Sequence, residues 1–294
     1  MAQNSMTKKQ HYVPRTYLRG FSDDEKRLWS YVLEPHDNGT LVSIESICRE
    51  NYLYEVRDQA GGFVAPNFIE KVLAELEKQY RPHMRKLRQK AFVEANYETK
   101  SFFTQEEKIF WKIFVAIQIM RAPEVIEAAE TAAKGFLPDN TSENELHMIA
   151  VSQCMPFFNA IKPDDVNAFT IFLKPLLDMS IAVGVDKKKS LFTSDNPVYC
   201  YTPQYENMGQ IDTYERIVFP LDSELVLIMF GGELQERYDK NRAFPLDGNE
   251  IETVKLSIAY AARNRIFSRV RLSDKDIKII RRARREKQEE IQRG

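Results

Sequence analysis

Apolar residues recur every three or four positions through the middle of the chain, which is the period of one buried helix face. The pattern begins after Pro66, a favoured first-turn residue, and Pro82 should kink or end this helix. Thr104-Gln105-Glu106-Glu107 is a capping box, and the segment 109–120 that follows is apolar nearly all round. Such a helix is central to a core. Further helices are predicted over 143–158, 163–179 and 247–262.

Stretches rich in β-branched and aromatic residues lie towards both ends of the chain. Segments 27–33 and 40–44 flank Asp37-Asn38-Gly39, which favours a hairpin. Further strands are predicted over 51–56, 181–185, 216–220 and 224–230, and an edge strand over 265–270. We therefore predict an α+β fold, in which a central helical block packs on an antiparallel or mixed sheet formed from the N- and C-terminal segments.

A single α+β domain of residues 11–270 accounts for this pattern, since a chain of 294 residues has ample material for a core. Residues 1–10 are polar, and we expect them to be disordered. Residues 271–294 are expected to form a highly charged amphipathic helix with a thin apolar stripe. A solvated terminal helix is the commoner outcome for such a segment, and docking onto a partner or onto DNA is the alternative.

Composition narrows the class of protein. Hydrophobic residues make up 43% of the chain and charged residues 29%, with a net charge of −1, so no overall basic field indicates a nucleic-acid partner. A DNA contact would need a local basic patch, such as the Arg and Lys residues of 81–90. Cys48, Cys154 and Cys200 lie far apart, which disfavours a zinc site or a disulfide framework and fits a cytoplasmic protein. No apolar run is long enough to span a membrane.

The sequence Ser194-Asp195-Asn196-Pro197 is a compact polar motif between two apolar, aromatic stretches. Val, Tyr and Thr favour strands, and Asn before Pro favours a turn. We expect two buried strands to meet at a turn that presents Ser194, Asp195 and Asn196. Asp195 and Asn196 could activate and orient a water molecule. The alternative is a structural Asx-turn, in which Asp195 bonds the backbone further along.

Further polar residues interrupt apolar surroundings. His11, Arg15 and Arg19 accompany an extended segment and a short helix near the N-terminus. Glu70 and Glu77 are seven residues apart and share one stripe of the helix after Pro66. Gln118 and Arg121 lie one turn apart on one side of the apolar helix. A charge in that context needs partners, so Arg121 either pairs with Glu70 or Glu77 or binds an anion.

These residues carry a resemblance to a known family. The ordered motifs are His11-Tyr12-Val13-Pro14-Arg15 with Tyr17-Leu18-Arg19 and Phe21, Glu70 and Glu77, Arg121-Ala122-Pro123, Ser194-Asp195-Asn196-Pro197, and Asn264-Arg265-Ile266-Phe267-Ser268. Together they resemble the domain-of-unknown-function family numbered 4238, from His11 to Ser268. The resemblance implies an association with bacterial phage defence and with excision of modified bases from phage DNA. The terminal helix lies outside the similar region.

The available residues fit some chemistries better than others. Zinc-binding and nucleophile-elbow spacings are missing from the sequence, as are the glycine loops that bind cofactors, so we expect no metal and no cofactor. Cleavage of a glycosidic bond needs a carboxylate and groups that stabilise the leaving group. Asp195 could supply the carboxylate, Asn196 a positioning amide and His11 the acid. Because such partners must reach one substrate, His11 and Asp195 are predicted to meet in space.

The leading hypothesis is therefore a DNA glycosylase-like hydrolase that acts on a modified base. Its substrate-binding residues would hold phosphate or sugar oxygens, line the pocket, or stack on a flipped base: Tyr12, Arg15, Tyr17, Arg19, Gln118, Arg121, Ser194 and Tyr199. Glu70 and Glu77 would be supporting carboxylates. Two alternatives stay open: a metal-dependent nuclease that uses Asp195 with Glu70 and Glu77, and a non-catalytic binding or sensor module whose partner docks on the terminal helix.

Overall fold

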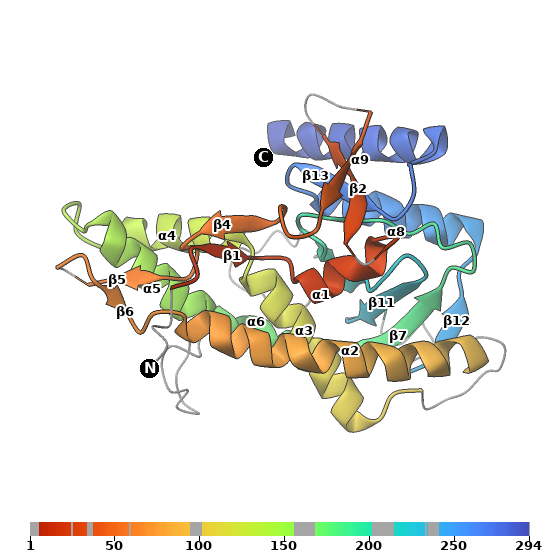
Figure 1. Ribbon diagram of the computed structural model, residues 1–294, viewed down its shortest axis with the longest axis horizontal. Helices are drawn as coiled ribbons and strands as arrows, with labels where there is room; N and C mark the ends of the chain where they lie inside the picture. The colour runs from red at the N-terminus through yellow and green to blue at the C-terminus, as the bar shows by residue number, and fades with distance from the viewer. Residues whose placement is uncertain are drawn as a thin grey trace.

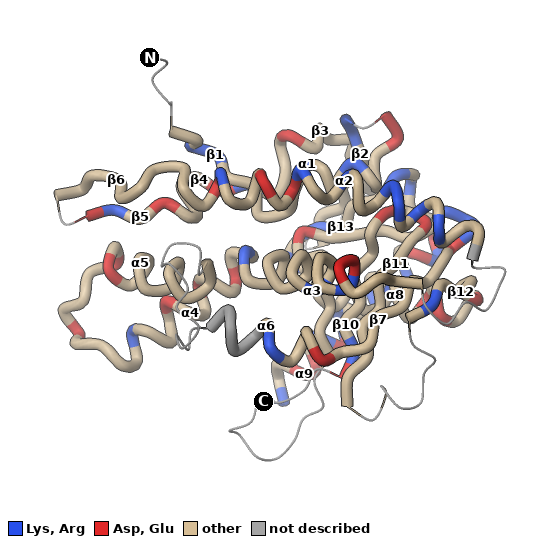
Figure 2. Tube along the Cα trace, turned by 90° about the horizontal axis from the view of Figure 1, so that it is seen from below, with Lys and Arg blue, Asp and Glu red and all other residues tan. Residues whose placement is uncertain are grey.

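The computed structural model describes residues 6–24, 26–33, 38–58, 60–94, 102–155, 168–201, 215–232, 234 and 241–293. They form the expected α+β fold (Figure 1). A block of helices occupies the middle of the chain: α2 (Phe68–Glu94), α3 (Gln105–Met120), α4 (Pro123–Phe136), α5 (Glu143–Cys154) and α6 (Ala168–Asp178). The longest of them, α2, runs along one side of the molecule, and the C-terminal helix α9 (Asp274–Arg293) lies on the opposite side (Figures 1 and 2).

The start of α3 confirms the capping box. The Thr104 side chain accepts from the Glu107 amide, and the Glu107 carboxylate accepts from the Thr104 amide. Pro82 does not end α2, which continues to Glu94, because Tyr80, Leu87 and Ala91 on both sides of it are buried. Residues 156–167, in which two predicted helices end and begin, lie outside the described residues.

The larger sheet has five strands in a mixed arrangement. Its order is β12 (Ala243–Pro245), β7 (Ser180–Val185), β11 (Leu225–Phe230), β10 (Arg216–Pro220) and β9 (Tyr199–Tyr201). Strands β12 and β7 are parallel, and all other neighbours are antiparallel. Strand β11 is buried along its whole length, so this sheet has core on both faces.

The second sheet joins the two ends of the chain, as predicted. Its order is β3 (Thr40–Ser43), β2 (Arg27–Val32), β13 (Arg265–Ser268) and β8 (Thr193–Ser194), with every pair antiparallel. The pairing of β2 with β3 confirms the predicted hairpin. The prediction of an edge strand after Arg265 is wrong: β13 is central, because its apolar residues Ile266 and Phe267 are fully buried.

Short strands hold the N-terminal segment. Strand β1 (Lys9–His11) pairs with β4 (Arg49–Asn51), and β5 (Val56–Arg57) pairs with β6 (Phe63–Val64). Two expectations are therefore corrected. Residues 9 and 10 are ordered, since Gln10 is buried and bonds Glu55 and Tyr54. Segment 51–56 is not one strand, because Tyr52 adopts a positive φ of 57° between β4 and β5.

The C-terminal helix packs against the rest of the chain. It lies on α8 (Gly248–Ala261) and buries Ile279, Ile280 and Ala283. At the end of α8, the Lys287 amine and the Arg284 guanidinium donate to the carbonyl of Ala262, which satisfies a helix C-terminus with positive charge. In the described part of the chain, no helix is long and apolar enough to cross a membrane.

Candidate functional site

The Ser194-Asp195-Asn196-Pro197 turn connects two sheets. Strand β8 before it pairs with β13, whereas β9 after it pairs with β10, so the two strands meet at the turn without pairing with each other. Ser194 stabilises the turn locally: its hydroxyl donates to the carbonyl of Asn196 and accepts from the Asn196 amide. The backbone direction at this point is thus set by the motif itself.

Asp195 acts as a structural clamp. Its side chain is buried, with the residue only 4% exposed, and its two oxygens accept from the amides of Arg263 and Asn264 at 2.9 Å each. Its own amide donates to the carbonyl of Arg265. Burial raises the pKa of this carboxyl, and the backbone donors oppose that shift. Asp195 therefore binds the segment that connects α8 to β13. Its hydrogen bonds are long-range in sequence, whereas an Asx-turn would bond the backbone a few residues further along.

Gln118 of α3 and Arg121, the residue that caps its C-terminus, position the N-terminal motif. The Gln118 amide donates to the carbonyl of Tyr12, and the Arg121 guanidinium donates to the carbonyl of His11. Arg121 also donates to Glu77 Oε1 at 3.0 Å, so the predicted pairing with a carboxylate of α2 is present. The hydroxyl of Tyr54 completes this arrangement by donating to the Arg121 carbonyl. Gln118 and Arg121 thus hold protein groups.

His11, Arg15, Glu70, Glu77 and Arg121 form what we call the acid–base centre. Arg15 and Arg121 both act electrostatically on His11 and on Glu70, which places the four charged or titratable groups around one region. The side chain of Arg15 is half exposed and pairs with Glu45, so the centre borders the surface there. All five residues belong to the motifs that the sequence singled out.

Protonation in this centre departs from the usual states. Burial raises the pKa of Glu70 to about 7. Burial, with Arg15 and Arg121, lowers the pKa of His11 to about 4, so the ring is uncharged at neutral pH. The ring donates to the backbone of Glu45, which leaves its other nitrogen as an acceptor. His11 Nε2 and Glu70 Oε1 are both buried without a hydrogen-bond partner. These are properties of groups that transfer protons.

Tyr12 belongs to a second group of polar residues. Burial raises the pKa of its phenol, and the charges of Asp195 and Glu124 act in the same direction. Burial also raises the pKa of Glu124, whose Oε2 has no hydrogen-bond partner. Across the described chain no hydrogen bond or ion pair joins His11 to Asp195. The structure therefore assigns His11 and Tyr12, neighbours in sequence, to different electrostatic surroundings.

Tyr17, one of the predicted substrate-binding residues, has a structural role, whereas the hydrogen bonds of Arg19 within the described residues involve only its backbone. Tyr17 is fully buried, donates to the carbonyl of Pro220, shares a hydrogen bond with Thr193, and stacks on Phe219 at 5.1 Å. It is a core residue that no base could reach. Arg19 begins the short helix η1 (Arg19–Phe21), is partly buried, and accepts from Ser22 through its carbonyl.

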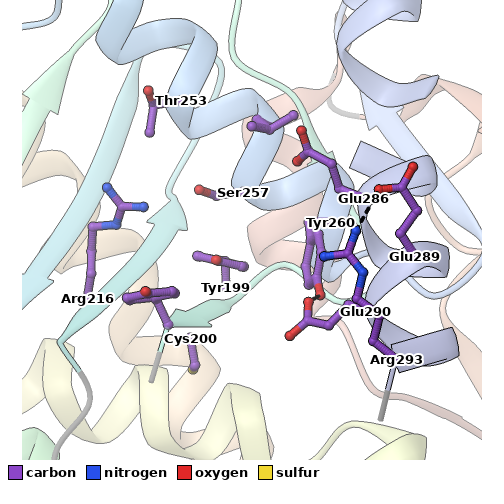
Figure 3. Close-up of a pocket in the computed structure, with 12 residues that line it drawn as sticks. Tyr199, Cys200, Arg216, Thr253, Ser257, Tyr260, Glu286, Glu289, Glu290 and Arg293 are labelled. Carbon is purple, nitrogen blue, oxygen red and sulfur yellow. Dashed lines mark hydrogen bonds and ion pairs between the residues drawn. The ribbon is translucent and has the colours of Figure 1, made fainter. Parts of the chain in front are cut away.

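Two adjoining cavities contain the remaining predicted residues. One, of about 310 Å³, is lined by Asn196 and Tyr199 together with the amine-bearing Lys287 of α9. The other, of about 760 Å³, lies between β9, β10, α8 and α9 (Figure 3). Tyr199 and Tyr260 line both, with their rings edge to face at 5.9 Å. Asn196 and Tyr199 are thus accessible, as the stacking hypothesis requires.

The residues of the nuclease alternative do not converge. Among the described residues, no group of three His, Cys, Asp or Glu side chains could hold a metal ion. Asp195 is bonded to backbone amides, and Glu77 is paired with Arg121. In the proposed basic patch, where Lys and Arg gather along the C-terminal part of α2 (Figure 2), two basic side chains pair with carboxylates of the protein. Arg88 pairs with Asp222 and Glu224, and Lys90 pairs with Glu107.

Comparison with known proteins identifies the family. Residues 9–271 match the family described as Protein of unknown function (DUF4238). The chain belongs to this family. The match covers the acid–base centre and the Asp195 clamp of this DUF4238 protein, and it ends before α9. No curated protein and no solved structure matches the chain.

Several residues around the acid–base centre and around Asp195 were not among the candidate site residues predicted from the sequence. Tyr54 bonds Arg121, Glu124 lies near Asp195, and Lys287 reaches the Asn196 cavity from α9. Glu124 directly follows the Arg121-Ala122-Pro123 motif, in which Pro123 begins α4. That proximity was the only local signal. Tyr54 and Lys287 become neighbours of the motifs through tertiary packing alone.

Proposed function

We propose that this protein hydrolyses the N-glycosidic bond of a modified base in DNA, with Glu70 and His11 as the proton-transfer groups. The observation that carries the proposal is Glu70, a half-buried carboxyl with a pKa of about 7 and one buried oxygen without a hydrogen-bond partner. A group with that pKa can donate and accept a proton near neutral pH, which is what acid–base catalysis requires. The family resemblance supplies the substrate class, modified phage DNA in the cytoplasm.

Each group has one role in the proposed reaction. Protonated Glu70 donates to the departing base as the glycosidic bond breaks and its electron pair passes to the base. Water adds to the sugar carbon and gives its proton to His11 Nε2, which returns it to Glu70. Arg121 lies beside both groups and stabilises negative charge that develops on the base. The products are a free base and an abasic site.

The test uses DNA with modified bases and unmodified DNA, incubated with the purified protein in chelator and without added metal. Free base, abasic sites and strand breaks are measured separately. We expect base release from the modified DNA alone, and a loss of about 100-fold or more in Glu70→Gln, the range that one acid–base group contributes. His11→Ala should lose activity as well. The rate should depend on pH around 7, where Glu70 titrates.

The matched control is Glu75→Gln, since Glu75 is exposed on the same helix and pairs with Lys78. It should retain wild-type activity. Full activity in Glu70→Gln, with the variant folded like the wild type, would remove Glu70 from the mechanism. Strand breaks without free base, seen only with added magnesium, would instead favour the nuclease alternative.

A further inference from the structure

A third cavity lies between the five-stranded sheet and α8. Its volume is about 330 Å³, and its walls are mostly apolar: Val218, Ile228, Phe230, Phe244, Leu246 and Val254. Residues two apart on a strand point to one face, so β10, β11 and β12 contribute this wall together. Between β11 and β12, strand β7 has small residues on the same face, with Ala182 opposite Ile228 and Gly184 opposite Phe244. Leu246 and Val226 occupy the space where a side chain at Gly184 would lie, so Leu246 can approach the sheet closely as one wall of the cavity.

Two arginines extend into this apolar cavity. Arg216 lies at the start of β10, and Arg242 immediately precedes β12. The Nε atoms of both are buried without a hydrogen-bond partner. In the described ranges neither side chain forms an ion pair, and the recorded contact of the Arg242 guanidinium is the ring of Phe244, at 5.1 Å. Buried donors without acceptors are costly, so a pair of them in one cavity is evidence for a missing anion.

One carboxylate borders the cavity and sets its net charge. Glu250 is exposed at the mouth, and its Oε2 accepts from the Asp247 amide in the capping box of α8. Two guanidinium groups and one carboxylate leave a single positive charge to be balanced. That balance favours a monoanion over a phosphate dianion.

We propose that this cavity binds a small amphipathic carboxylate. Its carboxylate would accept from Arg216 and Arg242, whose planar guanidinium groups match carboxylate geometry. Its hydrocarbon part would lie against Val218, Phe230 and Val254, where burial of apolar surface contributes most of the affinity. The site shares no residue with the acid–base centre. It adjoins the larger cavity of Figure 3 through Arg216 and Thr253, which line both.

The probe is octanoate, titrated by calorimetry into the full-length protein and compared with octanol and with inorganic phosphate. Octanol keeps the hydrocarbon part and lacks the charge, whereas phosphate keeps the charge and lacks the hydrocarbon part. We expect saturable binding of one octanoate per chain, with both other probes at least about ten-fold weaker. Octanol lacks the charge that the guanidinium groups would bind, and phosphate lacks the apolar surface that the cavity would bury.

Variants locate the site. Arg242→Gln and Arg216→Gln should each weaken octanoate binding about ten-fold or more. Arg281→Gln is the control, since Arg281 is exposed on α9 away from the cavity. Equal affinity for octanol and octanoate would overturn the proposal, as would phosphate that binds as tightly as octanoate. Unchanged octanoate binding in both arginine variants would place the ligand elsewhere. The comparison of the three probes on the wild-type protein tests the ligand chemistry even if a variant is unstable.

Discussion

Glu70 keeps its proton to an unusually high pH, and that has a consequence for stability as well as for chemistry. Burial raises its pKa from 4.5 to about 7 in the folded state. Between these values the folded protein binds more protons at this site than the unfolded chain does. The contribution of Glu70 to the free energy of unfolding therefore falls as the pH rises from about 4.5 to about 7. His11 has the opposite effect, because its pKa is lowered from 6.5 to about 4.

Glu70→Gln isolates the first contribution, since the amide does not titrate while His11 is retained. Relative to the wild type, the variant should become progressively more stable as the pH rises from 5 to 8. The gain should be roughly 1–2 kcal/mol once the partial exposure of Glu70 is allowed for. Urea unfolding at several pH values measures it, with Glu75→Gln as control. A difference that does not change with pH would show that Glu70 ionises normally.

At Asp195 the sequence predicted the local structure and missed the partner. The turn follows from Ser194, Asn196 and Pro197, whose preferences are local. The bonds from the amides of Arg263 and Asn264 to Asp195 depend on packing between segments almost 70 residues apart, which no local pattern encodes. The same limit explains Tyr17, whose motif position suggested stacking on a base, although its ring lies in the core against Phe219.

At the scale of elements, the contact between α8 and α9 includes a buried ion pair. Lys255 donates to Asp276 at 2.7 Å, and their side chains are only 7% and 13% exposed. Lys255→Met should cost about 3–5 kcal/mol of unfolding free energy, because it leaves the Asp276 charge buried without its partner. Thermal and urea unfolding of the variant test this expectation.

A second lysine between the same helices provides the comparison. Lys275 pairs with Glu252 at 3.0 Å, but their side chains are 69% and 38% exposed. Lys275→Met should therefore cost less than about 1 kcal/mol, the upper range for surface pairs. Equal losses in both variants would mean that burial does not distinguish the two ion pairs.

Element types were predictable where one face has a clear period, and sheet membership was not. The capping box and apolar run of α3, and the hairpin of β2 and β3, follow from short-range patterns. Strands β8 and β9 are close in sequence, yet they belong to different sheets. The central place of β13 also depends on distant partners, because a strand of four residues has no local signal for its neighbours.

At the scale of the whole molecule, the family match and the folded unit have different ends. The match stops at residue 271, and the sequence suggested a charged helix after it that is solvated or docks on a partner. In the structure that helix contributes Ile279, Ile280 and Ala283 to the core with α8, and Lys287 to the Asn196 cavity. The apolar stripe of α9 is narrow because α9 packs mainly against one helix, α8.

Removal of α9 should therefore destabilise the rest of the chain. A protein that ends at Leu272 loses the buried side chains Ile279 and Ile280, and burial of two such side chains contributes roughly 3–6 kcal/mol. It also loses the pairing of Lys255 with Asp276. We expect a lower unfolding temperature and aggregation. The loss of function on this deletion would then reflect unfolding, and could not by itself support a partner that docks on α9.

A shorter deletion separates these explanations. A chain that ends at Lys287 keeps the three buried residues, the ion pair and the bonds from Lys287 to the carbonyls of Tyr260 and Ala262, and it removes only exposed residues of α9. It should unfold within a few degrees of the full-length protein. If the chain ending at Leu272 were equally stable, α9 would be an appendage and a docking role would regain support. If only the chain ending at Leu272 unfolds, α9 is part of the fold. Its basic residues Arg284 and Lys287 then serve to bond the carbonyls at the C-terminal end of α8.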